Sequence, residues 1–320
     1  IDELIREAND LVYEKKYQDA ATLFSRAREM QRNLSLEYPR SPYASRAREA
    51  NLRVRMQNAS AFSSYERLRN LEGLLNRSLT EGNFQEAKLL VEQLSDRINQ
   101  FEVRYSLSTL PVNELSSRVS YLKRKERYLQ EIQSSISADV VPVPGEPGIQ
   151  MLATEVPQYL YELVMDTNPS RNVGGELPTE TVTLDEVDLF LERIGWVLSR
   201  RTRLPTLEEF RTAAEMAVEA EDFRILSAGA GENSTRPVHS LDADPAGFYH
   251  LLGNVSEIVQ ISPESEEVGH VGGNLRTIRS QIVELEPVSV EPGERNRMVG
   301  FRFVIEDSLL DLMLPPDPEI

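Results

Sequence analysis

The 320-residue sequence contains no cysteine. This absence excludes disulfide bonds, metal sites built on thiolates and cysteine nucleophiles. No apolar run approaches the roughly 18 residues that a membrane-spanning helix requires. Because the first residue is Ile1 rather than Met, we expect a mature or trimmed N-terminus. We expect membrane contact only through a segment or a partner outside this chain.

Glycine and proline are scarce in the first part of the chain. Residues 1–140 contain two Gly and three Pro, whereas the remaining residues contain 14 and 15. Because both residue types interrupt helices, this contrast predicts an α+β protein with an all-helical first domain. We expect helical residues 1–139, a Pro/Gly linker at residues 140–148, and a second domain at residues 149–320 with a tail from about residue 307.

The charge is distributed unevenly along the chain. The net charge is −17, of which residues 1–140 contribute +2 and residues 141–320 contribute −19. An acidic domain repels phosphate backbones, so we do not expect nucleic-acid binding. The acidic charge is explained either by solubility or by a docking face for a basic partner or for cations.

Two similar segments in the first domain, residues 14–20 and 81–87, place an aromatic residue three positions before an alanine. The two alanines are 67 positions apart, which is close to two 34-residue periods. The pattern resembles tetratricopeptide repeats over roughly residues 1–101, without their Trp and closing Pro. We therefore expect a repeat-like, protein-binding helical domain, with Tyr17 and Phe84 as candidate partner-binding residues.

A long helix is expected over residues 112–136, and it carries a basic cluster. The cluster consists of Lys123, Arg124, Lys125 and Arg127. It is explained either as a solvated face or as a contact for an acidic surface, which could be the second domain of this chain.

The second domain is expected to contain short strands and three helices. The strand candidates are residues 140–143, 180–184, 281–285 and 301–305. The helix candidates are residues 154–164, residues 185–198 with Thr183 or Asp185 as the N-cap, and a third helix that begins at Thr206 and has a capping box completed by Glu209.

Four short motifs follow one another in this domain. They are RLPT at residues 203–206, GNVSE at 253–257, GG at 272–273 and GFR at 300–302. Their order and spacing resemble the formylglycine-generating enzyme family, also called sulfatase-modifying factor domains, over about residues 141–306. The resemblance implies a C-type-lectin-like α+β fold with much irregular structure.

The resemblance does not extend to the catalytic thiols. Family members that are enzymes hold copper with two cysteines, and the corresponding positions here fall near Thr277 and Ile282. Neither side chain forms a thiolate, so we expect no oxidase activity and no cofactor.

The resemblance also implies a calcium loop, which is degenerate in this chain. Its candidate ligands are His250, the carbonyl groups of Gly253 and Val255, and Glu257. An imidazole is a poor ligand for a hard cation, so calcium binding is possible but weakened.

Other chemistries find little support. All three histidines, His239, His250 and His270, lie in the second domain, so the histidine-bound iron site of related oxidases cannot be built with the helical domain. The sequence has no nucleophile elbow, and the glycine-rich residues 229–232 lack the lysine of a phosphate-binding loop.

The sequence therefore predicts a non-catalytic pseudoenzyme, a scaffold subunit that binds other proteins within a larger assembly of a bacterial periplasm or cell envelope. One alternative is a receptor for a peptide, a glycan or a small ligand that uses the loops at residues 229–246 and 274–297. The other alternative is an enzyme of an unrecognised type.

Overall fold

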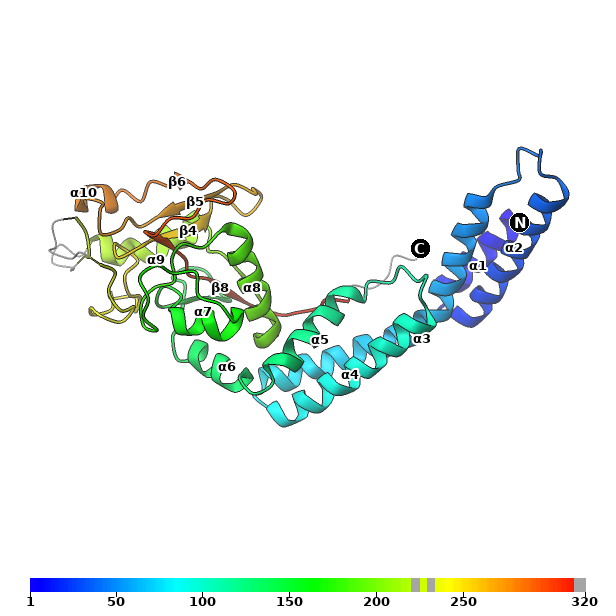
Figure 1. Cartoon of the computed structure of the whole chain (residues 1–320), viewed down its shortest axis with the longest axis horizontal. Coiled ribbons are helices and arrows are strands. Elements are labelled where there is room, and N and C mark those ends of the chain that lie inside the picture. The colour runs from blue at the N-terminus through cyan, green and yellow to red at the C-terminus, as the bar shows by residue number, and fades with distance from the viewer. Residues whose placement is uncertain (220–224, 229–233, 314–320) are drawn as a thin grey trace. The chain divides into compact units, whose positions relative to one another are not determined.

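The computed structural model describes residues 1–219, 225–228 and 234–313 of the chain (Figure 1). The chain divides into two compact units, which are residues 1–124 together with residues from 311 onward, and residues 125–310. The predicted α+β class is confirmed, because long helices form the first unit and small sheets lie in the second. Among the described residues, no helix is both long enough and apolar enough to span a bilayer.

Five helices build the first unit. They are α1 (Asp2–Tyr13), α2 (Tyr17–Glu37), α3 (Arg46–Thr80), α4 (Phe84–Arg104) and α5 (Asn113–Lys125), the last of which ends at the boundary between the units. Helix α3 is the longest, and Figure 1 shows α2 and α4 each running beside it. Ser45 and Asn83 cap α3 and α4 by accepting hydrogen bonds from backbone N–H groups in the first turns.

The expected helical domain is present, and each of its two similar segments consists of a turn followed by the first residues of the next helix, α2 or α4. Ala20 and Ala87, which follow these turns, are fully buried. The ring of Tyr17 stacks on Phe62 of α3, with 4.5 Å between the ring centroids. The small alanines thus let α2 and α4 approach their neighbours closely, and Tyr17 fills the space beside the first turn.

The structure places the division between the units earlier than the sequence predicts. The expected helix at residues 112–136 is interrupted, and α6 (Leu129–Ser137) begins a new helix within the second unit. The Lys125 ammonium donates to the Leu163 carbonyl at 2.7 Å and to the Asp166 carboxylate at 2.5 Å, which fixes the break. The expected linker at residues 140–148 begins with a strand, β1 (Val140–Pro142), that pairs with β2.

In its described residues, the second unit contains two four-stranded sheets and, after α6, four further helices. The strands are β2 (Ile149–Leu152), β3 (Arg200–Arg203), β4 (Ser256–Gln260), β5 (Val268–Val271), β6 (Val288–Ser289), β7 (Val299–Gly300) and β8 (Val304–Leu309). The helices are α7 (Gln158–Met165), α8 (Leu184–Leu198), α9 (Leu207–Glu219) and α10 (Arg279–Ile282). One sheet has the order β1-β2-β8-β3, and the other has the order β6-β5-β4-β7, with β4 and β7 parallel.

Local signals in the sequence locate the longer helices correctly. Thr183 and Glu186 form a reciprocal capping box at the start of α8, and Thr206 and Glu209 exchange the same bonds at the start of α9. Each capping box provides acceptors for two backbone N–H groups that would otherwise lack partners, so the start of each helix is determined by nearby residues.

Two of the predicted strands are wrong. In residues 180–184, the first four form a loop and Leu184 begins α8, and the buried carboxylate of Glu180 holds the loop by accepting hydrogen bonds from the backbone N–H groups of Arg171 and Asn172. In residues 281–285, Ile282 belongs to the short helix α10. Strands β4 and β5 were not among the expected elements, because their burial depends on helices distant in the sequence.

Aromatic side chains from α7, α8 and the segment before β8 pack together in the second unit. The rings of Tyr161 and Phe190 stack with 5.4 Å between centroids, and Phe301 meets Phe190 edge-on at 5.3 Å. All three side chains are buried. These contacts fix α7 and α8 against the segment that leads into β8.

The segment that follows β8 belongs to the first unit. The backbone N–H of Leu312 donates to the carboxylate of Glu72 on α3 at 3.2 Å. Glu72 is itself buried and lies 3.4 Å from the guanidinium of Arg118 on α5. Met313 is fully buried. The helical unit is therefore completed by residues from near the other end of the sequence.

Replacing the buried Met313 tests this role of the C-terminal segment. Met313→Ala is expected to lower the free energy of unfolding of the first unit by about 2–4 kcal/mol, because it leaves a cavity. Hydrogen exchange of the α3 amides measures the change. Leu309→Ala is the matched control, because Leu309 is 58% exposed. Unchanged exchange in the Met313 variant would contradict the role.

Candidate functional site

A buried arginine links four separate segments of the second unit. The guanidinium of Arg302 donates to both carboxylate oxygens of Glu257 on β4, at 2.5 and 2.7 Å. It also donates to the carbonyl groups of Leu152, Ala153 and Tyr249, at 3.2, 2.9 and 2.9 Å. Both charged side chains are completely buried. The register makes this contact possible, because Glu257 pairs with Gly300, two residues before the arginine.

A second buried carboxylate lies beside this pair. Asn254 donates from its side-chain amide to Oε1 of Glu155 at 2.9 Å, whereas Oε2 of Glu155 is buried without a partner. Burial, and then the charge of Glu257, raise the pKa of Glu155 well above its ordinary value. One guanidinium cannot neutralise two carboxylates, so the protonated form of Glu155 is favoured while Glu257 stays paired with Arg302.

Two of the four candidate calcium ligands, Glu257 and His250, are hydrogen-bonded to other side chains. Both carboxylate oxygens of Glu257 accept hydrogen bonds from Arg302. The buried imidazole of His250 lies with Nε2 3.2 Å from the Ser240 hydroxyl, and burial lowers the pKa of His250 to about 4. As placed, this donor set does not fit a calcium ion, and calcium binding stays a prediction.

The backbone of the same loop packs closely against the backbone of Leu226. Gly253 has φ +95°, and a Cβ atom at this position would lie 2.3 Å from the Leu226 carbonyl oxygen. Val255 is buried in the core. The described residues contain no group of three His, Asp or Glu side chains spaced to hold a metal ion.

The side chains at the two positions expected for the catalytic thiols, Thr277 and Ile282, stabilise the fold. Ile282 is only 1% exposed and belongs to the hydrophobic core. A Cβ atom at Gly273 would lie 2.4 Å from its Cγ1 atom, so the side chain packs directly against the double-glycine turn. The Thr277 hydroxyl accepts a hydrogen bond from the Asn274 backbone N–H at 3.2 Å. Neither residue offers a donor that fits copper.

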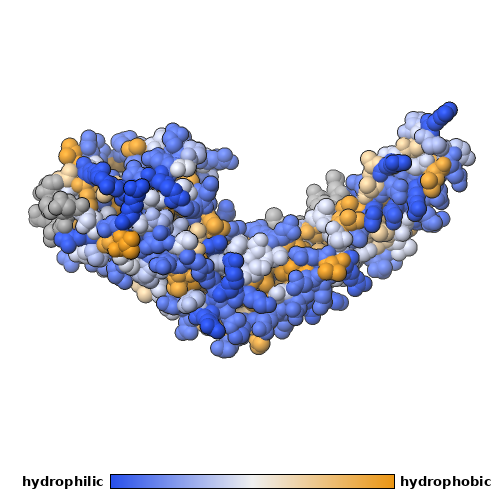
Figure 2. Space-filling model, in the orientation of Figure 1, coloured by the Kyte–Doolittle hydropathy of each residue, from blue (hydrophilic) through white to orange (hydrophobic). Residues whose placement is uncertain are grey.

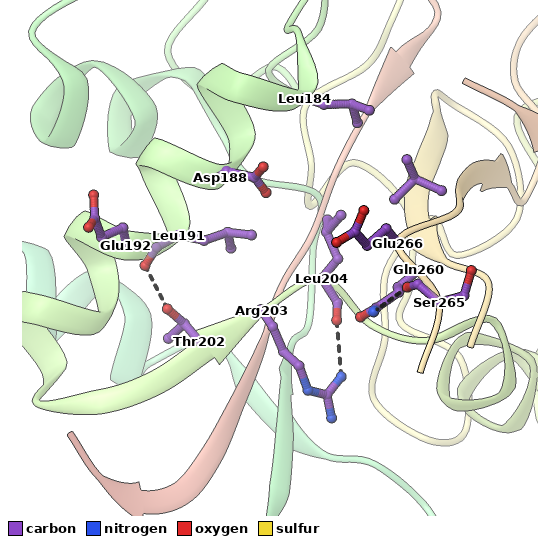
Figure 3. Close-up of a pocket in the computed structure, with 11 residues that line it drawn as sticks. Leu184, Asp188, Leu191, Glu192, Thr202, Arg203, Leu204, Gln260, Ser265 and Glu266 are labelled. Carbon is purple, nitrogen blue, oxygen red and sulfur yellow. Dashed lines mark hydrogen bonds between the residues drawn. The ribbon is translucent and has the colours of Figure 1, made fainter. Parts of the chain in front are cut away.

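A cleft lies on the surface of the second unit. Its volume is about 540 Å³, and it lies between α8, β3 and the turn that joins β4 to β5 (Figure 3). Leu184, Leu191, Leu204 and Val268 supply apolar walls. The polar lining residues are Asp188, Glu192, Thr202, Arg203, Gln260, Ser265 and Glu266.

Hydrogen bonds hold the walls of this cleft in place. The Thr202 hydroxyl donates to the Leu191 carbonyl at 2.6 Å and so ties β3 to α8. The Gln260 amide donates to the Ser265 carbonyl at 2.9 Å and so closes the turn after β4 (Figure 3). The cleft is therefore preformed by the fold.

The charge of the cleft is negative. Three carboxylates line it, from Asp188, Glu192 and Glu266, and Arg203 is the cation among its lining residues. The guanidinium of Arg203 points away from Asp188 in Figure 3 and is bound by Glu209 at 2.6 Å and by Glu306 at 2.8 Å. Burial and the neighbouring charge of Asp185 raise the pKa of Asp188. The arrangement favours a cationic ligand.

The candidate partner-binding residues of the helical domain have mixed environments. Lys123, Arg124 and Arg127 are exposed, but Lys125 is buried and holds the α7 terminus. Tyr17 is partly buried against Phe62. Phe84, at the start of α4, is also only partly exposed. The structure leaves their role in partner binding as a prediction.

Sequence reasoning missed the acidic cleft. A signal was present, because Asp185, Asp188 and Glu192 recur at a spacing of three and four residues along one predicted helix. Nothing in the sequence, however, placed Glu266 opposite that helix. Of the loops expected to bind a ligand, residues 229–233, including the glycine-rich segment, lie outside the described residues.

Residues 153–307 match the family described as sulfatase-modifying factor enzyme 1-like domain. These residues form a sulfatase-modifying factor domain. The match includes both members of the Glu257–Arg302 pair and the whole acidic cleft. No curated protein matches the chain.

Solved structures with similarity to the chain include three proteins. Treponema denticola variable protein 1 is 18% identical, with a TM-score of 0.44, over 52% of this chain and 91% of that chain. CarF is 17% identical, with a TM-score of 0.41, over 52% and 92%. PvdO from Pseudomonas aeruginosa is 16% identical, with a TM-score of 0.40, over 52% and 90%.

The buried carboxylate of Glu155 makes the stability of the sulfatase-modifying factor domain depend on pH. Its pKa is higher in the folded state than in the unfolded state, so its favourable contribution is complete below the unfolded pKa and is lost as the pH rises through the folded pKa. A difference of one in pKa between the folded and unfolded states corresponds to about 1.4 kcal/mol in the free energy of unfolding.

Glu155→Gln is therefore expected to flatten the fall in stability as the pH rises above the ordinary glutamate pKa of about 4.3, because glutamine keeps the acceptor for Asn254 and carries no titrating proton. Denaturant unfolding of the domain at several pH values measures this. Glu162→Gln, at an exposed position on α7, is the control. Identical pH profiles for the Glu155 variant and the wild type would contradict the assignment of the proton.

Proposed function

We propose that this protein is a non-catalytic binding protein whose sulfatase-modifying factor domain receives a cationic group of a protein partner in the acidic cleft. The observation that supports this most directly is the preformed cleft of about 540 Å³ with three carboxylates on its lining. Its one lining cation is already bound by Glu209 and Glu306. A lysine or arginine side chain would place a positive charge beside Asp188 and Glu266.

The shape of the cleft also suits such a side chain. Leu191, Leu204 and Val268 can pack against the methylene groups of a lysine or arginine. The carboxylates of Asp188 and Glu266 then meet the charged end. Because Asp188 is partly desolvated beside a second acid, a bound cation relieves an unfavourable charge and gains more than it would at an open surface.

The absence of catalysis is part of this proposal. The resemblance to the family implies that oxidase chemistry depends on two thiols, and the equivalent positions hold Thr277 and the core residue Ile282. An altered reaction centre with an intact fold is typical of domains that are retained for binding. An unrecognised enzymatic activity is the competing possibility, and a metal assay tests it.

We place the protein in a larger assembly of a bacterial periplasm or cell envelope, with the helical unit as a second binding module. This part of the proposal is supported by the combination of a repeat-like helical unit with an acidic domain of net charge −19 over residues 141–320. The natural occupant of the cleft would then be a basic protein surface.

A receptor for a small ligand is the second candidate. The apolar wall of the cleft and its volume also suit a small molecule with an amine or guanidinium group. This cleft lies outside the loops at residues 229–246 and 274–297 that the sequence suggested for a receptor. Binding of a free amine as tightly as of a peptide would favour this candidate.

A copper assay tests the absence of oxidase chemistry. The purified chain, incubated with copper and then desalted, is expected to retain far less than one equivalent, because no thiolate is present. Elemental analysis measures the metal, and oxygen uptake with a thiol substrate measures turnover. Stoichiometric copper together with thiol-dependent oxygen uptake would overturn the non-catalytic assignment.

Neutralising the cleft tests the proposed ligand class. A lysine- and arginine-bearing peptide selected against the full chain is expected to bind about two- to fivefold more weakly to Asp188→Asn and to Glu266→Gln, and more weakly at higher salt. Glu208→Gln, an exposed acid outside the cleft, is the control. Calorimetry gives the affinities, and equal effects of all three substitutions would reject the cleft as the binding site.

A further inference from the structure

A second, positively charged cleft lies in the helical unit. Its volume is about 140 Å³, and it lies between α3 and α4. The residues whose polar groups line it are Ser64, Arg67, Arg97, Gln100, Arg104 and Tyr105. Leu68 and Phe101, both buried, form its apolar base.

The helix geometry brings the three arginines together. Arg97, Gln100 and Arg104 are spaced by three and four residues, so they share one face of α4. Arg67 reaches the same cleft from α3. The guanidinium carbon of Arg104 lies 5.5 Å from the centre of the Tyr105 ring, which positions this side chain at one end.

These three charges are not compensated within the unit. Within the described part of the chain, Arg67, Arg97 and Arg104 have no carboxylate within the 4.0 Å of an ion pair, whereas nearby Arg69 pairs with Asp311 at 3.5 Å. Three guanidinium groups around one small hollow repel one another. An anion in the hollow removes this repulsion and accepts hydrogen bonds from several of them at once.

We propose that this three-arginine cleft binds a phosphate monoester. Arginine presents a planar set of donors that matches the oxygens of a phosphate, and a dianionic phosphate balances three positive charges better than a single carboxylate does. The Ser64 hydroxyl and the Gln100 amide line the same hollow and add neutral donors. A phosphorylated side chain or a small phosphorylated metabolite supplies this group.

A membrane surface fits the cleft less well. Glu66, Asp96 and Glu102 are exposed and lie within two residues of the three arginines in the sequence. These acids repel a flat layer of anionic headgroups, but they leave a single phosphate free to enter the hollow. The face shown in Figure 2 is mostly hydrophilic, with scattered apolar patches.

Binding of phosphoserine to the full chain tests the proposal. Isothermal titration calorimetry is expected to give saturable binding of phosphoserine that weakens about three- to tenfold in each of Arg67→Gln, Arg97→Gln and Arg104→Gln, as the loss of one charge-assisted contact predicts. Arg53→Gln, an exposed position on α3 outside the cleft, is the matched control and is expected to bind normally. Circular dichroism checks that each variant is folded.

Three outcomes would overturn the proposal. The first is equal affinity of the cleft variants and the Arg53 control for phosphoserine. The second is binding of acetate as tight as that of phosphoserine, which would assign the cleft to carboxylates. The third is binding to vesicles that contain phosphatidylglycerol, a phosphate diester, that depends on these arginines while phosphoserine fails to bind.

Discussion

The sulfatase-modifying factor domain depends on one buried ion pair, Glu257 with Arg302. The arginine binds β4 through Glu257 and also holds three carbonyl groups from the β2 end and the loop at residue 249. A completely buried charge of this kind is tolerable only because every contact is satisfied. Loss of one partner would leave an uncompensated charge in the core. The irregular loops around the sheets are therefore held by a polar centre rather than by regular secondary structure.

This constraint explains how binding sites can change while the fold persists. The residues that organise the core, such as Asn254 and Glu257, are used for internal contacts. The acidic cleft is built from other residues, on α8 and on the turn between β4 and β5, so its charges do not serve the core. In the helical unit, the charges of the arginine cleft are likewise separate from the buried Glu72–Arg118 contact. Each unit thus combines a buried ion pair with a charged surface cleft, and the two clefts carry charges of opposite sign.

The sequence predicted much of the fold because its strongest signals are local. The capping pairs at Thr183 and Thr206 and the scarcity of glycine and proline before residue 140 need no distant contacts. Short strands were harder, since residues 281–285 have strand-like composition, yet Ile282 is packed as a helix against Gly273. Only part of the candidate site could be predicted. The helical spacing of its acids predicts the acidic face of α8, whereas Glu266 lies on a turn some 75 residues further along the chain, and only the tertiary structure brings it close to α8.

By itself, the sequence determined that thiol chemistry is absent, that the charge is concentrated after residue 140, and that a helical part precedes a mixed part. These properties follow from residue identity and from contacts within one or two helical turns. Only the tertiary structure decided that Glu257 is committed to Arg302, that Glu155 is buried beside them, and that Met313 completes the helical unit. Such outcomes depend on which distant segments exclude water from one another, and the energy of a buried charge is set by that exclusion.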